Sequence, residues 1–210
     1  MPIVDLSHPI TSGMPVYPGD PAPTSAQVTS LAETGYVTRQ LVLGSHTGTH
    51  IDAPAHMLAG GPTLSDLPIA TFIGLARVLH LPVEAGKTIA LARLAPHETD
   101  LEACGFLVIN TGWHRRWGQP DYFANYPTLS VDAANWLARQ GLKGVGLDTP
   151  SADGPTSQVY AVHHALLGAG MVIVENLTNL DALPDRVTFS AFPLPIAGAD
   201  GSPVRAIAIW

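Results

Sequence analysis

The chain has 210 residues, of which 46% are hydrophobic and only 13% are charged, and its formal net charge at pH 7 is -7. This length supports one sizeable hydrophobic core, so we expect a single domain over residues 1–210. Its ten Lys and Arg residues form no basic run, which argues against nucleic acid or an anionic membrane surface as a partner.

Cys104 is the only cysteine, so an intrachain disulfide is impossible and a buried thiol is expected. The N-terminal residues lack a basic segment followed by an apolar run, and no stretch approaches eighteen uninterrupted apolar residues. We therefore expect a cytoplasmic protein with no membrane partner. The low charged fraction indicates that another subunit covers part of the surface.

Taken in chain order, short apolar and β-branched runs predict strands separated by loops and by few helices. The strands are expected at Ile3–Leu6, Tyr36–Leu43, Phe72–Leu81, Phe106–Asn110, Val145–Leu147, Met171–Val174, Val187–Phe192 and Val204–Ile209. Helices are expected at Ile89–Leu94, from Ser130 to Gln140, and from about Thr156 to Leu167. This order predicts an α/β fold with a mixed sheet.

Several local signals refine these elements. Ser130 is a suitable N-cap and Gly141 a suitable C-cap for the helix between them. The turn sequence YPGD carries Tyr17, which is expected either to pack locally or to contact a ligand. After residue 56, Gly60 and Gly61 allow a loop to fold over a neighbouring site.

Potential metal ligands are concentrated in residues 46–56, which read HTGTHIDAPAH and contain His46, His50, Asp52 and His56. The glycines and Pro54 disfavour a helix, so an extended segment is expected, in which residues of the same parity share one face. Two imidazoles and one carboxylate suit zinc, manganese or iron(II). His56 lies beyond this compact set and is free to act as a base.

Three ligands from one segment leave a divalent ion short of its usual four to six, so other donors are needed. His163, His164 and Glu175 lie at the two ends of a predicted helix, turn and strand. A histidine on an apolar helix face is more often packed in the core than a ligand, whereas a glutamate ending an apolar strand is costly to bury unpaired. By contrast, His97 and Glu98 lie in a charged run and are expected on a solvated surface.

An aromatic and basic stretch follows the predicted strand Phe106–Asn110. Strand ends in α/β sheets often open onto ligand sites, so Trp113 and the residues up to Trp117 are expected either to line a pocket entrance or to form an exposed loop.

The string H-T-G-T-H-x-D-x-P-x-H closely resembles the metal-dependent hydrolases of the cyclase family, whose best understood members are bacterial kynurenine formamidases. The start DLSHPI, the turn YPGD, GLDTPSAD at 146–153, residues 163–177 and the tail DGSPVRAIAI at 200–209 extend the resemblance over nearly the whole chain. The resemblance implies a swivelling β/β/α fold and a homodimer in which the neighbouring subunit helps wall the pocket.

The resemblance also implies roles for residues. Asp52 would bridge two zinc ions, His46 and His50 would complete the first ion's shell, and His163 with Glu175 would hold the second. His56 would be the catalytic proton carrier, and Tyr17 would help wall the substrate pocket. A single manganese, as in related isatin hydrolases, is the alternative metal content.

The activity implied is hydrolysis of a small amide, with N-formyl-kynurenine as the first substrate, yielding formate and kynurenine in tryptophan catabolism. Tyr17 stands where these formamidases tend to have Trp, so cyclic amides and lactones stay open as substrates. Two other classes are less favoured. An iron oxygenase with a two-histidine, one-carboxylate site would be crowded by His163 and Glu175, and a structural metal site would be closed and rich in cysteine.

Overall fold

The computed structural model describes residues 1–210 and is built around a nine-stranded mixed sheet with the order β1-β13-β11-β5-β7-β9-β10-β4-β12. Strands β5, β7, β9 and β10 run parallel in its centre, and the outer strands are antiparallel. The strands of this sheet are β1 (Ile3–Asp5), β4 (His50–Asp52), β5 (Ile73–His80), β7 (Phe106–Asn110), β9 (Gly144–Leu147), β10 (Val172–Glu175), β11 (Arg186–Ser190), β12 (Gly201–Pro203) and β13 (Ile207–Ile209).

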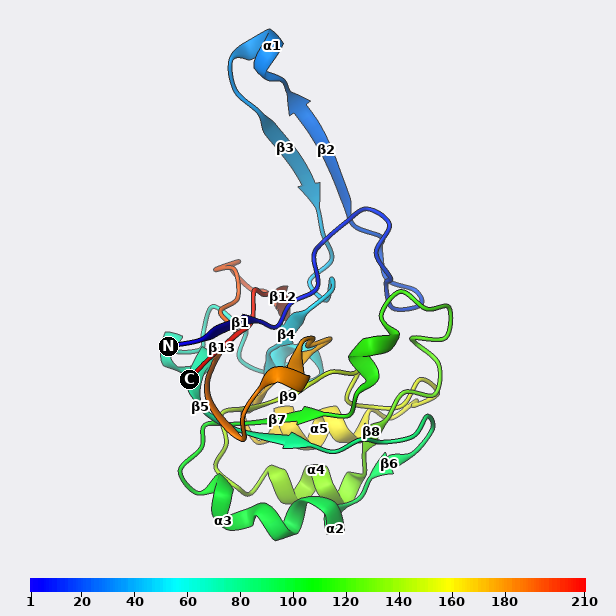
Figure 1. Cartoon of the computed structure of the whole chain (residues 1–210), viewed down its shortest axis with the longest axis vertical. Coiled ribbons are helices and arrows are strands. Elements are labelled where there is room, and N and C mark those ends of the chain that lie inside the picture. The colour runs from blue at the N-terminus through cyan, green and yellow to red at the C-terminus, as the bar shows by residue number, and fades with distance from the viewer.

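The helices are few and short, and the longer ones lie against one face of the sheet (Figure 1). They are α1 (Leu31–Thr34), α2 (Leu91–Leu94), α3 (Glu98–Leu101), α4 (Val131–Leu137) and α5 (Ala161–Gly168), with 3-10 turns η1 (Pro54–His56), η2 (Ile69–Phe72), η3 (Ala95–His97), η4 (Trp113–Arg116) and η5 (Leu180–Ala182). The expected α/β class with a mixed sheet and few helices is confirmed. None of these helices has the length and apolar character needed to cross a bilayer.

Alternating side chains of the central strands fill two separate cores. In β7, Leu107 and Ile109 face the helices, whereas Phe106 and Val108 belong to the core on the opposite face. This two-sided burial explains why the strand reads as a continuous apolar run in the sequence. Cys104 is buried beside the helix-side core, as expected.

Most predicted elements are present, with shifted ends. Ser130 caps α4 by accepting a hydrogen bond from the Ala133 amide, which typically contributes about 1 kcal/mol. The largest shift is at α5, which begins at Ala161 rather than near Thr156, so Val159 is exposed instead of joining its apolar face. An Asp153 carboxylate that accepts from the Val162 and His163 amides defines this later start.

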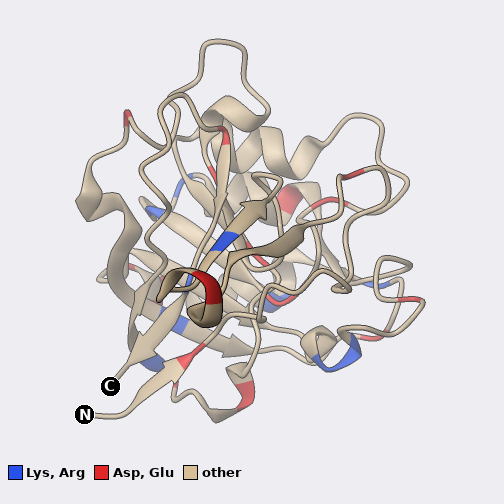
Figure 2. Ribbon diagram, turned by 90° about the horizontal axis from the view of Figure 1, so that it is seen from above, with Lys and Arg blue, Asp and Glu red and all other residues tan.

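A hairpin of β2 (Thr24–Thr29) and β3 (Thr38–Val42) extends away from the body, with α1 at its tip (Figure 1). The strand expected at Tyr36–Leu43 therefore exists, but every residue of β3 is exposed. A further small parallel sheet pairs β6 (Thr88–Ile89) with β8 (Thr128–Leu129). Lys and Arg positions are scattered over separate elements (Figure 2), which agrees with the absence of a basic run in the sequence.

Candidate functional site

Strand register brings three ionisable side chains onto one face of the sheet. His50 and Asp52 are two residues apart in β4 and therefore point to the same side. Glu175, the last residue of β10, is paired directly with His50 across the antiparallel ladder. His163 approaches from α5, which precedes β10 in the chain, and all four side chains are buried.

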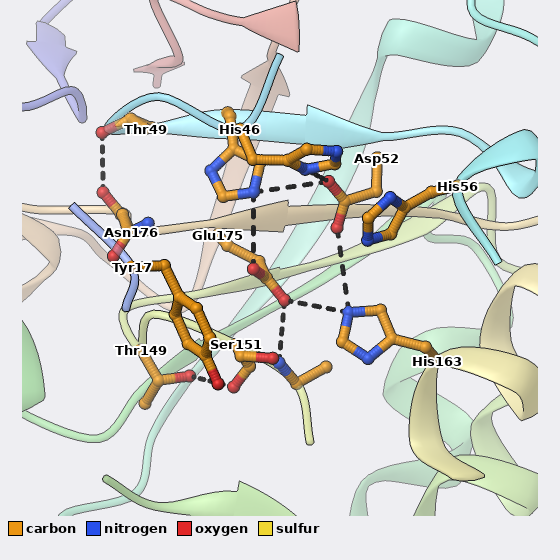
Figure 3. Close-up of polar contacts among 12 residues, drawn as sticks. Tyr17, His46, Thr49, Asp52, His56, Thr149, Ser151, His163, Glu175 and Asn176 are labelled. Atoms are coloured by element: carbon orange, nitrogen blue, oxygen red, sulfur yellow. Dashed lines mark hydrogen bonds and ion pairs between the residues drawn. The ribbon is translucent and has the colours of Figure 1, made fainter. Parts of the chain in front are cut away.

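His46 and His56 reach the same place from outside β4. His46 lies in the turn before the strand, and His56 lies in η1 after it, where Pro54 begins the 3-10 turn. The expectation that residues 46–56 form one extended segment is therefore wrong, because only His50–Asp52 is a strand. The side chains still converge, since the backbone bends around the site at both ends (Figure 3).

Two groups of potential ligand atoms meet at Asp52. The first comprises His46, His50 and Asp52, and the second comprises Asp52, His163 and Glu175; within each group the ligand atoms lie within 4.8 Å of one another. Asp52 Oδ1 is 2.7 Å from His46 Nδ1 and 3.3 Å from His50 Nε2. On the other side, His163 Nε2 is 4.0 Å from Asp52 Oδ2 and 3.4 Å from Glu175 Oε1.

The carboxylate of Asp52 provides a test of whether this donor set fits a cation. Both of its oxygens are buried and neither has a hydrogen-bond partner, although His46 Nδ1 is only 2.7 Å away. The short contact therefore lacks the alignment of a hydrogen bond. A buried carboxylate without hydrogen bonds is costly unless a positive charge neutralises it. Nitrogen and oxygen lone pairs gathered around such a carboxylate fit a divalent metal ion.

The three histidines of these groups are each oriented by a hydrogen bond on the side away from Asp52. His50 Nδ1 donates to the Gly48 carbonyl at 2.8 Å, and His163 Nδ1 donates to Asp153 Oδ2 at 2.6 Å. His46 uses its other nitrogen, donating from Nε2 to Asp200 Oδ2 at 2.9 Å. Each ring thereby turns its second nitrogen toward the carboxylates, where it can bind either a proton or a metal ion. Metal-binding histidines are typically oriented in this way.

The carboxylates near His50 and His163 raise the pKa values of these two histidines by more than burial lowers them. Burial alone would lower the pKa of His50, but Asp52 and Glu175 raise it well above its usual value. For His163, burial is likewise opposed by Asp153 and Glu175, which raise the pKa to about 10. The pKa of Asp52 is held well below its usual range, against the effect of burial, by His50 and His46. Without a metal ion, His50 and His163 therefore bind protons, and these supply the positive charge that a metal ion would otherwise provide.

His56 differs from these histidines because burial dominates its titration. Burial lowers the pKa of His56, despite the nearby Asp52 carboxylate, so the imidazole is neutral near pH 7. Its Nδ1 donates to Asp200 Oδ2 at 3.2 Å, which leaves Nε2 as a proton acceptor. The ring lies 4.1 Å from that of His46, centroid to centroid. His56 is therefore placed to exchange a proton beside the two ligand groups.

A cavity of about 370 Å3 opens onto the site, and four aromatic side chains contribute to its wall. His46, His50, His56, His163 and Glu175 line its floor. The aromatic side chains of the wall are Tyr17, Trp117, Phe123 and Tyr160. None of the ten Lys and Arg residues belongs to the lining. The cavity thus offers apolar ring surfaces beside a polar reactive centre.

The structure places the two aromatic residues singled out from the sequence differently. Tyr17 lines the cavity, and its hydroxyl is 3.3 Å from that of Tyr126. Trp113 does not line the cavity; it is buried, and its Nε1 donates to the Tyr122 carbonyl. The turn of η4 instead brings Trp117 to the wall. Of the stretch from Trp113 to Trp117 that was expected at a pocket entrance, Trp117 lines the cavity and Trp113 does not.

Other expectations about nearby residues are resolved by their positions. His164 is exposed on α5 and points away from the buried donors, and Glu98 is exposed at the start of α3. The loop after η1 contributes only Met57 to the cavity lining, because Gly61 packs closely on the backbone of Pro54. The loop therefore folds back on η1 rather than over the site.

Three residues of the site had no signal in the local sequence pattern. Asp153 orients His163, and Asp200 contacts both His46 and His56. Asn176, with a left-handed backbone (φ 57°), donates from its side chain to the Gly48 carbonyl, the same oxygen that accepts from His50. Only the segments GLDTPSAD and DGSPVRAIAI, noted for their family resemblance, pointed to Asp153 and Asp200.

Comparison with known proteins identifies the family. The Cyclase family model, described as "Putative cyclase", matches residues 4–154. A kynurenine formamidase of Geobacillus thermodenitrificans (strain NG80-2) is 37% identical over 207 residues, covering 98% of this chain and 96% of the relative. Isatin hydrolase A from Labrenzia aggregata superposes with a TM-score of 0.88 at 25% identity, covering 99% and 93% of the two chains. A predicted metal-dependent hydrolase from Bacillus stearothermophilus gives a TM-score of 0.82 at 28% identity, covering 99% and 97%.

These likenesses extend over nearly the full length of the chain and of its relatives, and they accompany a donor set that fits a metal ion. The chain belongs to the cyclase family of metal-dependent hydrolases, and it is a hydrolase.

Proposed function

We propose that this protein is an arylformamidase that hydrolyses N-formyl-kynurenine to kynurenine and formate, and so acts in tryptophan catabolism. The observation that carries the proposal is the pair of ligand groups sharing Asp52 at the floor of an aromatic cavity, with the neutral His56 beside them. The full-length similarity to a protein named kynurenine formamidase supports the choice of substrate.

We infer that the cofactor is zinc, with two ions per chain. His46, His50 and Asp52 would hold one ion, and Asp52, His163 and Glu175 the other, because these are the two of the three donor groups in the chain that share Asp52. When bound, a divalent ion supplies hydroxide near neutral pH, by lowering the pKa of water from about 15.7 toward 7, and polarises a carbonyl group. Nitrogen and carboxylate donors suit zinc and also manganese, which is the alternative.

In the reaction, water adds to the formyl carbon, the C–N bond breaks, and the aromatic amine and formate are released. His56 accepts a proton from the attacking water through Nε2 and returns it to the leaving nitrogen. The amine needs this proton because an amide anion is a very poor leaving group. The depressed pKa of His56 keeps the imidazole neutral and ready to accept the proton at pH 7.

The cavity fits the aromatic end of such a substrate. Tyr17 and Phe123 meet edge to face with ring centroids 5.7 Å apart, and Trp117 is a further ring on the wall. These flat apolar surfaces favour an aryl group, since aromatic pairs contribute about 0.5–1.5 kcal/mol beyond the burial of their area. The absence of Lys and Arg from the lining favours a reacting end without a negative charge.

A cyclic amide or lactone is the second candidate substrate class. The structural likeness to an isatin hydrolase, over 99% of this chain, supports it. An iron oxygenase is not supported, because His163 and Glu175 face Asp52 where such a centre needs open positions.

The test is steady-state hydrolysis of N-formyl-L-kynurenine and of isatin by the same zinc-loaded preparation, with absorbance following each product. The proposal predicts that kcat/KM for N-formyl-L-kynurenine exceeds that for isatin. The reverse preference would assign the chain to cyclic amides instead.

We further propose a cytoplasmic homodimer in which the hairpin is an interface element. Val28, Leu31, Leu41 and Val42 are all more than half exposed, and an isolated two-stranded hairpin is marginally stable in water. The hairpin joins the body beside Pro21 and Gly44, which both line the cavity, so a second copy packed on it reaches the pocket wall. Light scattering should give a dimer for the native chain and a monomer for the Val28→Glu, Leu41→Glu double variant.

A further inference from the structure

One carboxylate oxygen connects the ligand group to the proton-transfer histidine. Asp200 Oδ2 is 2.9 Å from His46 Nε2 and 3.2 Å from His56 Nδ1, and both contacts are hydrogen bonds. A carboxylate can only accept, so each imidazole carries its proton on the nitrogen that faces Asp200. In metal-loaded protein, where the ligating nitrogen of His46 cannot also hold a proton, the two rings are therefore opposite tautomers, with the proton on Nε2 in His46 and on Nδ1 in His56.

These opposite tautomers serve opposite purposes. In His46, the free lone pair is on Nδ1, which lies 2.7 Å from Asp52 Oδ1 in the ligand group. In His56, the free lone pair is on Nε2, the atom needed to accept a proton from water. We propose that Asp200 is a positioning residue that sets both tautomers at once, so that His46 presents a metal ligand while His56 presents a base.

The backbone holds Asp200 in register with Asp52. Asp200 immediately precedes β12, and its carbonyl accepts a hydrogen bond from the Ala53 amide at 2.8 Å. The next residue, Gly201, pairs with Asp52 across the antiparallel ladder. The backbone of Asp200 is therefore fixed relative to the strand that carries Asp52, and its half-exposed carboxylate is held by the hydrogen bonds from His46 and His56.

The most direct test reads the tautomers themselves. Long-range proton–nitrogen NMR spectra of zinc-loaded protein should show His56 protonated on Nδ1 and His46 protonated on Nε2. In Asp200→Ala, His56 should convert to a mixture containing the Nε2-protonated form, whereas Asp200→Asn, which keeps an acceptor oxygen, should retain the native tautomer. Asp132→Asn, an exposed carboxylate on the first turn of α4, is the matched control.

A His56 ring protonated on Nε2 in the native protein, or unchanged tautomers in Asp200→Ala, would overturn the assignment. So would a metal ion bound to His56 Nδ1, because Asp200 would then belong to a ligand group. This readout requires no substrate and is combined with a thermal melt to confirm that each variant is folded.

Zinc affinity and turnover provide a second test. The turnover measurement rests on the proposed function, whereas the zinc affinity measurement does not. Partners that orient metal-binding histidines typically change affinity or activity by about 10–100-fold when mutated. Asp200→Ala should weaken zinc binding about 10-fold and lower kcat at saturating zinc by about 10–100-fold with little change in KM, and Asp200→Asn should recover part of both losses. If the native protein does not hydrolyse N-formyl-kynurenine, the proposed function fails, while zinc affinity and the tautomers still decide the role of Asp200. Native zinc affinity in Asp200→Ala would contradict that role.

Discussion

Gly201→Ala is expected to displace a metal ligand by a single methyl group. Gly201 is buried in β12, and a Cβ atom built there would lie 2.7 Å from Cε1, 3.0 Å from Nε2 and 3.2 Å from Nδ1 of His46. Gly201 does not have a positive φ, so alanine is compatible with the backbone. The perturbation is therefore steric and is directed at one imidazole ring.

The distances give the size of the effect. Carbon atoms in contact prefer separations of about 3.5–4.0 Å, so the His46 ring must retreat by roughly 1 Å. That movement withdraws Nδ1 from Asp52 and stretches the hydrogen bond to Asp200. Displacements of this size can cost about 100-fold in rate. For zinc affinity we expect a 10–100-fold loss, which corresponds to about 1.4–2.7 kcal/mol.

Competition with a chromophoric chelator measures the zinc affinity of Gly201→Ala against the native protein. Gly168→Ala, at the end of α5 with no atom within 4 Å of the added methyl group, is the control and should bind zinc normally. Circular dichroism establishes that both variants are folded. A folded Gly201→Ala protein with zinc affinity within twofold of native would refute the reasoning.

Three further predictions follow from the site. Asp52→Asn should lose bound zinc and activity together, as elemental analysis and the hydrolysis assay on one sample would reveal; retained zinc would exclude the bridging role. His56→Ala should lower kcat by about 100–10,000-fold with zinc content unchanged, and loss of zinc would instead make His56 a ligand. In metal-free protein, the raised pKa of His163 stabilises the fold fully below pH 6.5, and this contribution is lost as pH rises toward about 10. The Tm of metal-free protein should therefore fall between pH 6.5 and 10, whereas a rising Tm would contradict the assigned charge.

The sequence predicted those parts of the fold whose signal is local. Strand β7 was predicted at Phe106–Asn110 with both ends correct, because its four consecutive apolar residues and the turn residues that follow Asn110 give a strong local signal. Helix α4 was predicted from the Ser130 cap. The start of α5 was misplaced, because the carboxylate that defines it, Asp153, comes from a loop and caps α5 without occupying its N-cap position.

The candidate site was predictable as a set of residues but not as a geometry. The alternation of side chains along a strand correctly placed His50 and Asp52 on one face. It does not apply to His46 and His56, which lie outside the strand and reach the site through a turn and through η1. The contribution of Asp200 depends on the pairing of β12 with β4, nearly 150 residues apart in the chain. No local pattern encodes that pairing.

The position of the hairpin and the residues of the cavity wall could not be predicted either, because no local sequence pattern encodes them. The sequence indicated a strand before the motif but not that β3 leaves the body with every residue exposed. Trp113 and Trp117 have similar local surroundings in the sequence, and only the turn of η4 decides which of them faces the cavity.

The most direct test of the account is reconstitution of chelated, metal-free protein with zinc. Hydrolysis of N-formyl-kynurenine and bound metal are measured on the same samples across the titration. We predict no turnover without metal, and activity that rises with bound zinc until about two ions are held per chain. Full turnover by metal-free protein, or a fully loaded protein that hydrolyses neither this amide nor isatin, would contradict the account.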